Sequence, residues 1–181
     1  MTNDRAAAPK TAHRRSREEL TPGQLRALAA TYVHPGQIRA SSAANPFITI
    51  LGSCVAVCLH DAAAQVGGLN HFLLPQAPGS TTRETAPRYA PSAIVQLIDQ
   101  VESQGGSRRR LTARIIGGAS VLAAMDHKEH LGHRNVAAAH QLLAKHGIAV
   151  TRIDVGGTRG RKLIFFPQDG SIVIQLLGGW A

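Results

Sequence analysis

Two neighbouring apolar runs decide the fold of this chain: Ile48-Thr-Ile-Leu-Gly-Ser-Cys-Val-Ala-Val-Cys-Leu-His-Asp61 and Val66-Gly-Gly-Leu-Asn-His-Phe-Leu-Leu-Pro75. Both are rich in β-branched and other apolar residues and too short for a periodic helix, which predicts two strands. The short connection between them is typical of a β-hairpin. Alternate residues of the first strand share a face, with Val55, Val57 and Leu59 on one and Cys54, Ala56 and Cys58 on the other.

The length of the hairpin loop decides which residues lie opposite one another. With a two-residue loop, Asp61 pairs with Ala64, and counting back along both strands puts Cys54 directly opposite His71. A four-residue loop that leaves Asp61 and Ala64 unpaired keeps this register, whereas a three-residue loop sends the two side chains to opposite faces. Directly opposed residues have Cβ atoms roughly 4.5–5.5 Å apart, which would let a thiol and an imidazole share a proton.

This pairing predicts a cysteine nucleophile with a histidine base. A thiol with a pKa near about 8.5 is mostly protonated at neutral pH, and only the thiolate attacks. An imidazole takes that proton and later gives it to a leaving amine. Gly52 leaves room for a substrate carbonyl, and the amide of Cys54 or a neighbour is a candidate oxyanion donor. The alternative is structural, because a cysteine in an apolar strand is commonly a small core residue.

The same segments resemble a known family. The signature of the chemoreceptor glutamine deamidase family, CheD, is similar to Leu51-Gly-Ser-Cys-Val-Ala-Val-Cys-Leu59, Asp61 and Gly67-Gly-Leu-Asn-His-Phe-Leu-Leu-Pro75. Supporting similarity lies in Gly117-Gly-Ala119, Gly132-His-Arg-Asn135 and Asp154-Val-Gly-Gly-Thr-Arg-Gly-Arg161. The resemblance runs from about Tyr32 to Leu177, which is most of the chain.

The resemblance implies roles for individual residues. Cys54 corresponds to the nucleophile and His71 to the base, and we expect Gly52, Ser53 and Asn70 in the oxyanion or substrate region.

The family also uses a threonine six positions before the cysteine, which orients the histidine. Ile48 stands at that position here. Thr49 is the adjacent candidate, but one step along a strand turns a side chain to the other face. The alternative is that Thr49 is only a residue of high β-propensity in the strand.

The resemblance further implies the reaction and the partners. The substrates would be glutamine side chains in the cytoplasmic region of methyl-accepting chemotaxis receptors, hydrolysed to glutamate without a cofactor. A CheC-type phosphatase would be a binding partner. Two alternatives stay open: a non-catalytic adaptor that binds this phosphatase or receptors, and a cysteine amidase or protease that acts on another protein amide.

Composition limits the other classes of function. The chain has 181 residues, a formal charge of +9 and 4% aromatic residues, and it lacks a recognisable nucleic-acid-binding motif, so nucleic acid is the weaker choice of partner. The resemblance implies an acidic protein surface instead, because the modification regions of chemoreceptors are rich in Glu and Gln. We expect no membrane span and no signal peptide. Cys54 and Cys58 would lie roughly 13 Å apart on one strand, too far for a disulfide, so a reducing, cytoplasmic location is expected.

The remaining pattern predicts an α+β domain. We expect a mobile basic extension over residues 1–31, one domain over 32–177 and a short tail over 178–181. The domain would hold two packed mixed β-sheets flanked by helices, which the resemblance likens to the catalytic domains of deamidating bacterial toxins. Helices are expected within 16–31, 91–104 and 135–146. The repeat of His127, His130 and His133 lacks suitable partner ligands, so no metal is expected.

Overall fold

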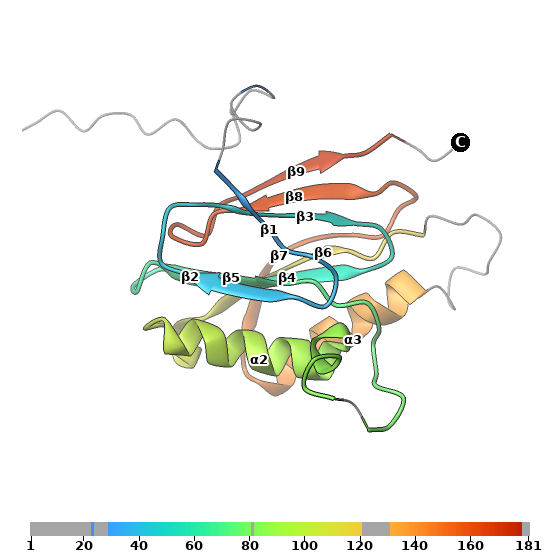
Figure 1. Cartoon of the computed structure of the whole chain (residues 1–181), viewed down its shortest axis with the longest axis horizontal. Coiled ribbons are helices and arrows are strands. Elements are labelled where there is room, and N and C mark those ends of the chain that lie inside the picture. The colour runs from blue at the N-terminus through green and yellow to red at the C-terminus, as the bar shows by residue number, and fades with distance from the viewer. Residues whose placement is uncertain (1–22, 24–28, 81, 121–130, 179–181) are drawn as a thin grey trace, which may run out of the picture.

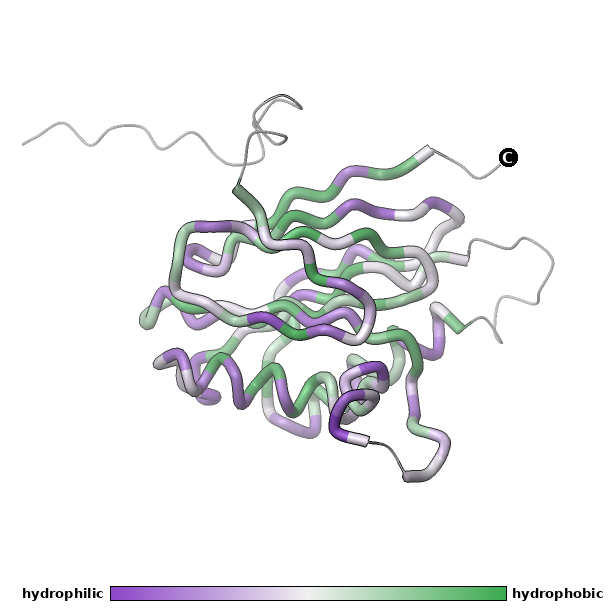
Figure 2. Tube along the Cα trace, viewed as in Figure 1, coloured by the Kyte–Doolittle hydropathy of each residue, from purple (hydrophilic) through white to green (hydrophobic). Residues whose placement is uncertain are grey.

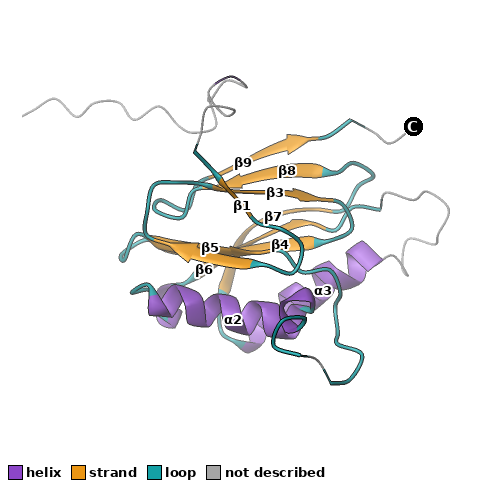
Figure 3. Ribbon diagram, in the orientation of Figure 1, coloured by secondary structure: helices purple, strands orange, loops and turns teal. Residues whose placement is uncertain are grey.

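Three layers make up the fold: a four-stranded sheet, a five-stranded sheet, and helices that cover the outer face of the second sheet (Figure 1, Figure 3). The structure is a computed structural model that describes residues 23, 29–80, 82–120 and 131–178. The predicted class, α+β with two mixed sheets and flanking helices, is confirmed.

The four-stranded sheet joins strands from both ends of the chain. Its order is β1 (Thr31–Tyr32), β3 (Phe47–Leu51), β8 (Arg161–Phe165) and β9 (Ile172–Leu176). β1 runs parallel to β3, and the other pairs are antiparallel. A strand from the first third of the chain therefore lies beside one from the last.

The five-stranded sheet contains the predicted hairpin at its centre. Its order is β2 (Ile38–Ser41), β5 (Val66–Asn70), β4 (Val55–Asp61), β6 (Thr112–Gly117) and β7 (Ala149–Val155). β6 and β7 are parallel, as their connection through a helix requires. The helices are α2 (Ala90–Ser103) and α3 (Leu131–Lys145), with single 3-10 turns at Ala86–Arg88 (η2) and Arg108–Arg110 (η3).

The predicted alternation along β4 is confirmed. Val55, Val57 and Leu59 pack with the buried side of α2, whereas Ala56 and Cys58 are buried between the two sheets, with Cys54 packed against that cluster. Figure 2 shows hydrophobic stretches along the strands and an alternation of hydrophobic and hydrophilic stretches along α2. β4 is buried on both faces, which fits its central place.

The predicted hairpin register is wrong by two residues. Asp61 pairs with Val66, so the loop holds the four residues 62–65. Further along, an isolated bridge joins Val55 to Phe72. His71 is therefore level with Ala56, and Cys54 lies one diagonal step away from His71. Because a shift of two preserves side-chain parity, both side chains still belong to the face between the sheets.

The side chain of Asp61 explains the longer loop. Its Oδ1 accepts hydrogen bonds from the amides of Ala63 and Ala64, at 3.1 and 3.2 Å, and Gln65 takes a positive φ of 52°. A short acidic side chain that bonds the amides two and three residues on stabilises a turn of this kind. The turn therefore begins after Asp61 and closes only at Val66.

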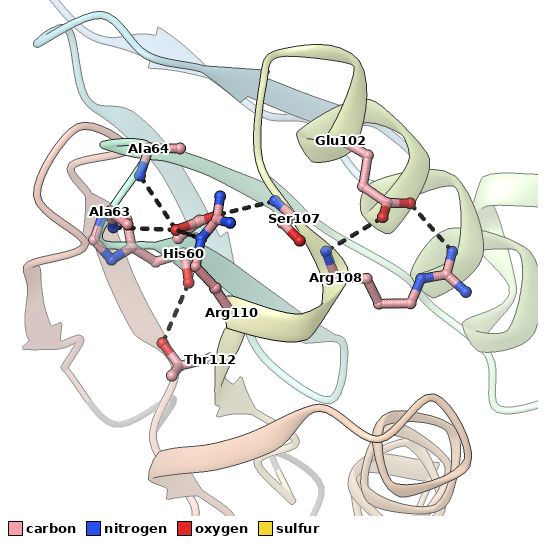
Figure 4. A network of polar contacts seen from close by, with 9 residues as sticks. His60, Ala63, Ala64, Glu102, Ser107, Arg108, Arg110 and Thr112 are labelled. Carbon is pink, nitrogen blue, oxygen red and sulfur yellow. Dashed lines mark hydrogen bonds and ion pairs between the residues drawn. The ribbon is translucent and has the colours of Figure 1, made fainter.

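The same carboxylate ties this turn to the connection between α2 and β6 (Figure 4). Ser107 donates its amide to Oδ2 at 2.9 Å, and Arg110 donates Nε to Oδ1 at 3.0 Å and pairs with Oδ2 at 2.7 Å. Burial alone would raise the pKa of Asp61, but the hydrogen bonds from Arg110, Ser107 and Ala64 outweigh it and lower the pKa to about 2.

Asp61→Asn is expected to lower the free energy of unfolding by about 2 kcal/mol at pH 7, because an amide cannot accept from all these donors. The folded-state pKa lies below the ordinary value of 3.8, so this stabilisation is present above pH 4 and is lost as the pH falls towards 2. Urea unfolding at pH 7, 4 and 2.5 measures the effect. A difference between wild type and variant that stays constant over this range would contradict it.

The helix predictions agree apart from their ends. α2 begins one residue before the predicted range, and α3 begins four residues before its own. Most of the helix expected within 16–31, together with His127 and His130, lies outside the described residues; His133 lies on α3. Over the described ranges, no three His, Cys, Asp or Glu residues gather as a metal site would require, and no helix is long and apolar enough to cross a membrane.

Candidate active site

Cys54 ends a bend of three residues between β3 and β4, and the carbonyls of this bend are held by neighbouring elements. The Gly52 carbonyl accepts from the Ala119 amide at 2.8 Å, and the Cys54 carbonyl accepts from the Gly118 amide at 2.8 Å. The carbonyl of Ser53 accepts from the side chain of Asn135 on α3, at 3.1 Å. Hydrogen bonds to all three of its carbonyls therefore fix the bend.

Fixing these carbonyls also orients the amides. In a trans peptide unit the N–H points away from the preceding C=O, so the amides of Ser53 and Cys54 face away from Ala119 and Asn135. The amide of Cys54 interacts favourably with its own thiolate. Neither amide is therefore directed at the group that holds the preceding carbonyl.

A pair of glycines lets β6 approach this bend. Gly117 has a φ of +112°, and a Cβ atom there would collide with the carbonyl oxygen of Cys54. Gly118, at φ +65°, lies against Gly132 and Val136 of α3 in the same way. A side chain at either glycine would displace the bend or the helix, because both positions combine a left-handed backbone with close contact.

The two cysteines differ in their surroundings. Burial raises the pKa of Cys54, and its own amide partly offsets this, so a protonated thiol is the resting form. Burial raises the pKa of Cys58 to about 12, against a smaller opposing effect of Arg114. Cys54 is half-buried whereas Cys58 is fully buried. Cys54 is therefore the thiol that a substrate would reach.

His71 is held at the end of β5, and Thr49 fixes its ring. Its backbone bonds to the segment before β2, with the Gly36 amide donating to His71 at 2.7 Å. Its Nδ1 lies 2.8 Å from Oγ1 of Thr49, which belongs to β3 in the other sheet. Oγ1 also lies 2.7 Å from the Val33 carbonyl, to which it donates. The ring thus joins the two sheets.

These contacts determine the tautomer of His71. A hydroxyl has one proton, and Thr49 gives it to a carbonyl that can only accept, so Nδ1 of His71 must donate to Oγ1. The lone pair is then on Nε2, which has no hydrogen-bond partner among the described residues although it is buried. A buried, unprotonated and unpartnered nitrogen is what a base for a nearby thiol requires.

Burial lowers the pKa of His71 to about 4, the Val33 carbonyl opposes this, and a smaller electrostatic effect of His34 acts in the same direction as burial. The imidazole is therefore neutral at physiological pH.

The structure places Thr49, and not Ile48, beside His71. Ile48 packs with Ile164, Phe166 and Val173 on the outer side of the four-stranded sheet. The expected alternation did not carry over from Cys54 to Thr49 because residues 52–54 form a bend and not a strand. Thr49 and His71 also belong to different sheets, so the distance between them depends on how the two sheets stack.

Two asparagines near the candidate site, Asn70 and Asn135, are fully buried. The side-chain oxygen of Asn70 accepts from the Val57 amide at 2.9 Å, which fills a gap in the β4–β5 ladder and leaves Nδ2 without a partner among the described residues. Asn70 is adjacent to His71 in an extended segment, so its side chain lies on the helix side of the sheet. Nothing in these contacts brings Asn70 to the substrate region.

Sequence reasoning missed Asn135. Its amide donates to two carbonyls, Ser53 at 3.1 Å and Leu73 at 2.8 Å, and the side chain is fully buried. A signal was present in the sequence, because Asn135 lies in helical register with Ala139 and Leu143. A polar residue on the apolar face of a helix requires buried partners.

The family model described as "CheD chemotactic sensory transduction" matches residues 73–176. A relative from Anaeromyxobacter dehalogenans, "Probable chemoreceptor glutamine deamidase CheD 1", is 44% identical over 177 residues, which is 98% of this chain and 100% of that protein. The chain belongs to the CheD family. The matched range of the family model begins after Cys54 and His71, so it does not itself assign roles to these CheD residues.

Two other relatives carry similar names. "Probable chemoreceptor glutamine deamidase CheD" from Laribacter hongkongensis is 43% identical, over 82% of this chain and 72% of that protein. "Probable chemoreceptor glutamine deamidase CheD 2" from Geobacter sulfurreducens is 35% identical, over 83% of this chain and 91% of that protein. Membership of the CheD family therefore rests on several relatives that the chain covers over most of their length.

Proposed function

We propose that this CheD protein hydrolyses glutamine side chains of chemoreceptors to glutamate, with Cys54 as nucleophile and His71 as base. The observation that carries the proposal is the Thr49 contact, which leaves Nε2 of His71 unprotonated and without a partner among the described residues. The names of the relatives supply the substrate class.

The reaction begins with proton transfer from the Cys54 thiol to Nε2 of His71. The sulfur then attacks the carboxamide carbon, and the amides of Ser53 and Cys54 stabilise the oxyanion of the tetrahedral intermediate. The C–N bond breaks as His71 returns the proton to the departing ammonia, which leaves a thioester on Cys54.

Water completes the cycle. His71 removes a proton from a water molecule, the resulting hydroxide attacks the thioester, and the thiol of Cys54 leaves with that proton. The product is a glutamate side chain, and no step of this sequence requires a cofactor. A neutral imidazole serves both half-reactions, which agrees with the low pKa of His71.

The proposal includes the partners. The substrate is the cytoplasmic region of methyl-accepting chemotaxis receptors, and the protein works in the cytoplasm, where a CheC-type phosphatase would bind it. The formal charge of +9 favours an acidic partner surface.

The test is intact-mass spectrometry of a chemoreceptor cytoplasmic fragment incubated with wild type and with Cys54→Ala. We expect a mass increase of about one dalton per modified glutamine with wild type and none with the variant, which lacks the nucleophile. Cys58→Ala is the matched control, because it removes a thiol that is fully buried, and it should retain activity. No mass change with a folded wild type that still binds the fragment would reject the deamidase and favour the adaptor.

A further inference from the structure

The ladder between β4 and β5 ends one step before the nucleophile. Val55 and Phe72 exchange both backbone hydrogen bonds, at 3.2 and 3.0 Å. At the next hydrogen-bonding position, Ser53 opposite Leu74, the ladder is broken, because the Leu74 amide donates to the Arg88 carbonyl at 3.1 Å and the Leu74 carbonyl accepts from the Ala90 amide at 2.9 Å. The backbone ladder thus does not itself fix the distance between the Cys54 bend and the segment after His71.

The side chain of Asn135 spans this gap. One Nδ2 hydrogen goes to Ser53, which precedes Cys54, and the other goes to Leu73, two residues after His71. Both acceptors are carbonyls and can only accept, so the orientation of the amide group is determined by its partners. The amide therefore links the two segments by two hydrogen bonds.

We propose that Asn135 is a positioning residue, whose amide holds the bend that carries Cys54 and the segment that carries His71 at the separation that proton transfer requires. This inference rests on the proposed function and adds to it a residue of α3 that does not touch the reacting atoms. Loss of the amide would let the two segments drift apart while leaving both side chains present.

Close packing of the start of α3 against Gly118 supports this contact. Gly132, one helical turn before Asn135, lies so close to Gly118 that a Cβ atom on it would collide with the Gly118 backbone. Gly118 is the residue whose amide bonds the Cys54 carbonyl. The first turns of the helix are therefore pressed against the same segment that fixes the bend, which places Asn135 within reach of Ser53.

The hydrogen-bonding groups of Asn135 are only partly satisfied. Oδ1 of Asn135 is buried and has no partner among the described residues. A buried acceptor without a donor costs free energy, but an apolar residue at this position would leave the Ser53 and Leu73 carbonyls without the donor that Asn135 supplies.

The experiment compares Asn135→Ala with Leu143→Ala. Leu143 is fully buried on the same helix face, roughly 12 Å further along the helix axis, so its truncation controls for helix loosening. We expect Asn135→Ala to lower kcat about 10- to 100-fold with KM changed less than about twofold, since the reacting groups are misplaced while the surface is intact. Leu143→Ala should retain kcat at temperatures at which it is folded.

A second readout does not need the receptor. Iodoacetamide reports on Cys54 alone, because Cys58 is fully buried with a pKa of about 12. Asn135→Ala should slow the alkylation of Cys54 towards the rate of His71→Ala. Asn135→Ser, which keeps one donor and a small volume, should lie between wild type and alanine and replaces the alanine variant if that fails to fold.

Two results would overturn the inference: wild-type kcat and alkylation rate in Asn135→Ala, or equal losses in Leu143→Ala. Failure of the proposed function is a separate outcome, because a wild type without deamidase activity would still show whether the alkylation rate depends on Asn135.

Discussion

His71→Ala is expected to lower kcat for glutamine deamidation by about 10³-fold, because the thiol of Cys54 loses the group that takes its proton and delivers it to ammonia. The residual activity should rise with pH, as the thiolate forms without help. Single-turnover deamidation of a receptor fragment, followed by mass spectrometry, measures the loss. Steady binding of the fragment by the variant is the control for folding.

The pH profile of the wild type gives a second check on His71. Its pKa is lowered from 6.5 to about 4, so the base stays unprotonated well into the acid range. The value of kcat/KM should therefore persist below pH 6.5 and decline towards pH 4. A decline centred near 6.5 would mean that the imidazole is more exposed, or more strongly paired with a thiolate, than its buried contact with Thr49 indicates.

Thr49→Val is expected to lower kcat by about 10²-fold or more, although no group that touches the substrate is changed. Valine has nearly the same shape, but it cannot accept from Nδ1 of His71, so the ring loses both its tautomer preference and its orientation. The Val33 carbonyl also loses its donor, which should lower the free energy of unfolding by about 1–2 kcal/mol.

Thr49→Ser separates these effects, because it keeps the hydroxyl and should restore most of the activity. NMR of the His71 ring nitrogens would show the change directly: protonated Nδ1 in wild type and in Thr49→Ser, and a mixture of tautomers in Thr49→Val. Equal kcat in wild type and Thr49→Val would mean that Thr49 only fills space in β3.

Sequence patterns predicted the strands and their faces because β4 is long, regular and alternating. The register of the hairpin was wrong because it depends on where the turn begins, and the carboxylate of Asp61 and the left-handed Gln65 decided that locally. Cys54 and His71 were still assigned to one face, since the error was an even number of residues.

The remaining site residues needed the tertiary structure. Thr49 reaches His71 from the opposite sheet, and alternation along one strand says nothing about how two sheets stack. The side chain of Asn135 donates to carbonyls that lie more than sixty residues away in the sequence. Nothing in the sequence around these carbonyls indicates that they need a donor. Such contacts are set by the docking of α3 and not by any local pattern.

The strand that holds Thr49 has a further consequence for how the protein is made. β3 pairs with β8, which in turn pairs with β9, so its sheet depends on strands that leave the ribosome long after β3. The hairpin with Cys54 and His71 emerges much earlier. A chain that lacks β8 and β9 would therefore carry both proposed reacting groups without an oriented imidazole, and the proposed activity would appear only after these two strands are made.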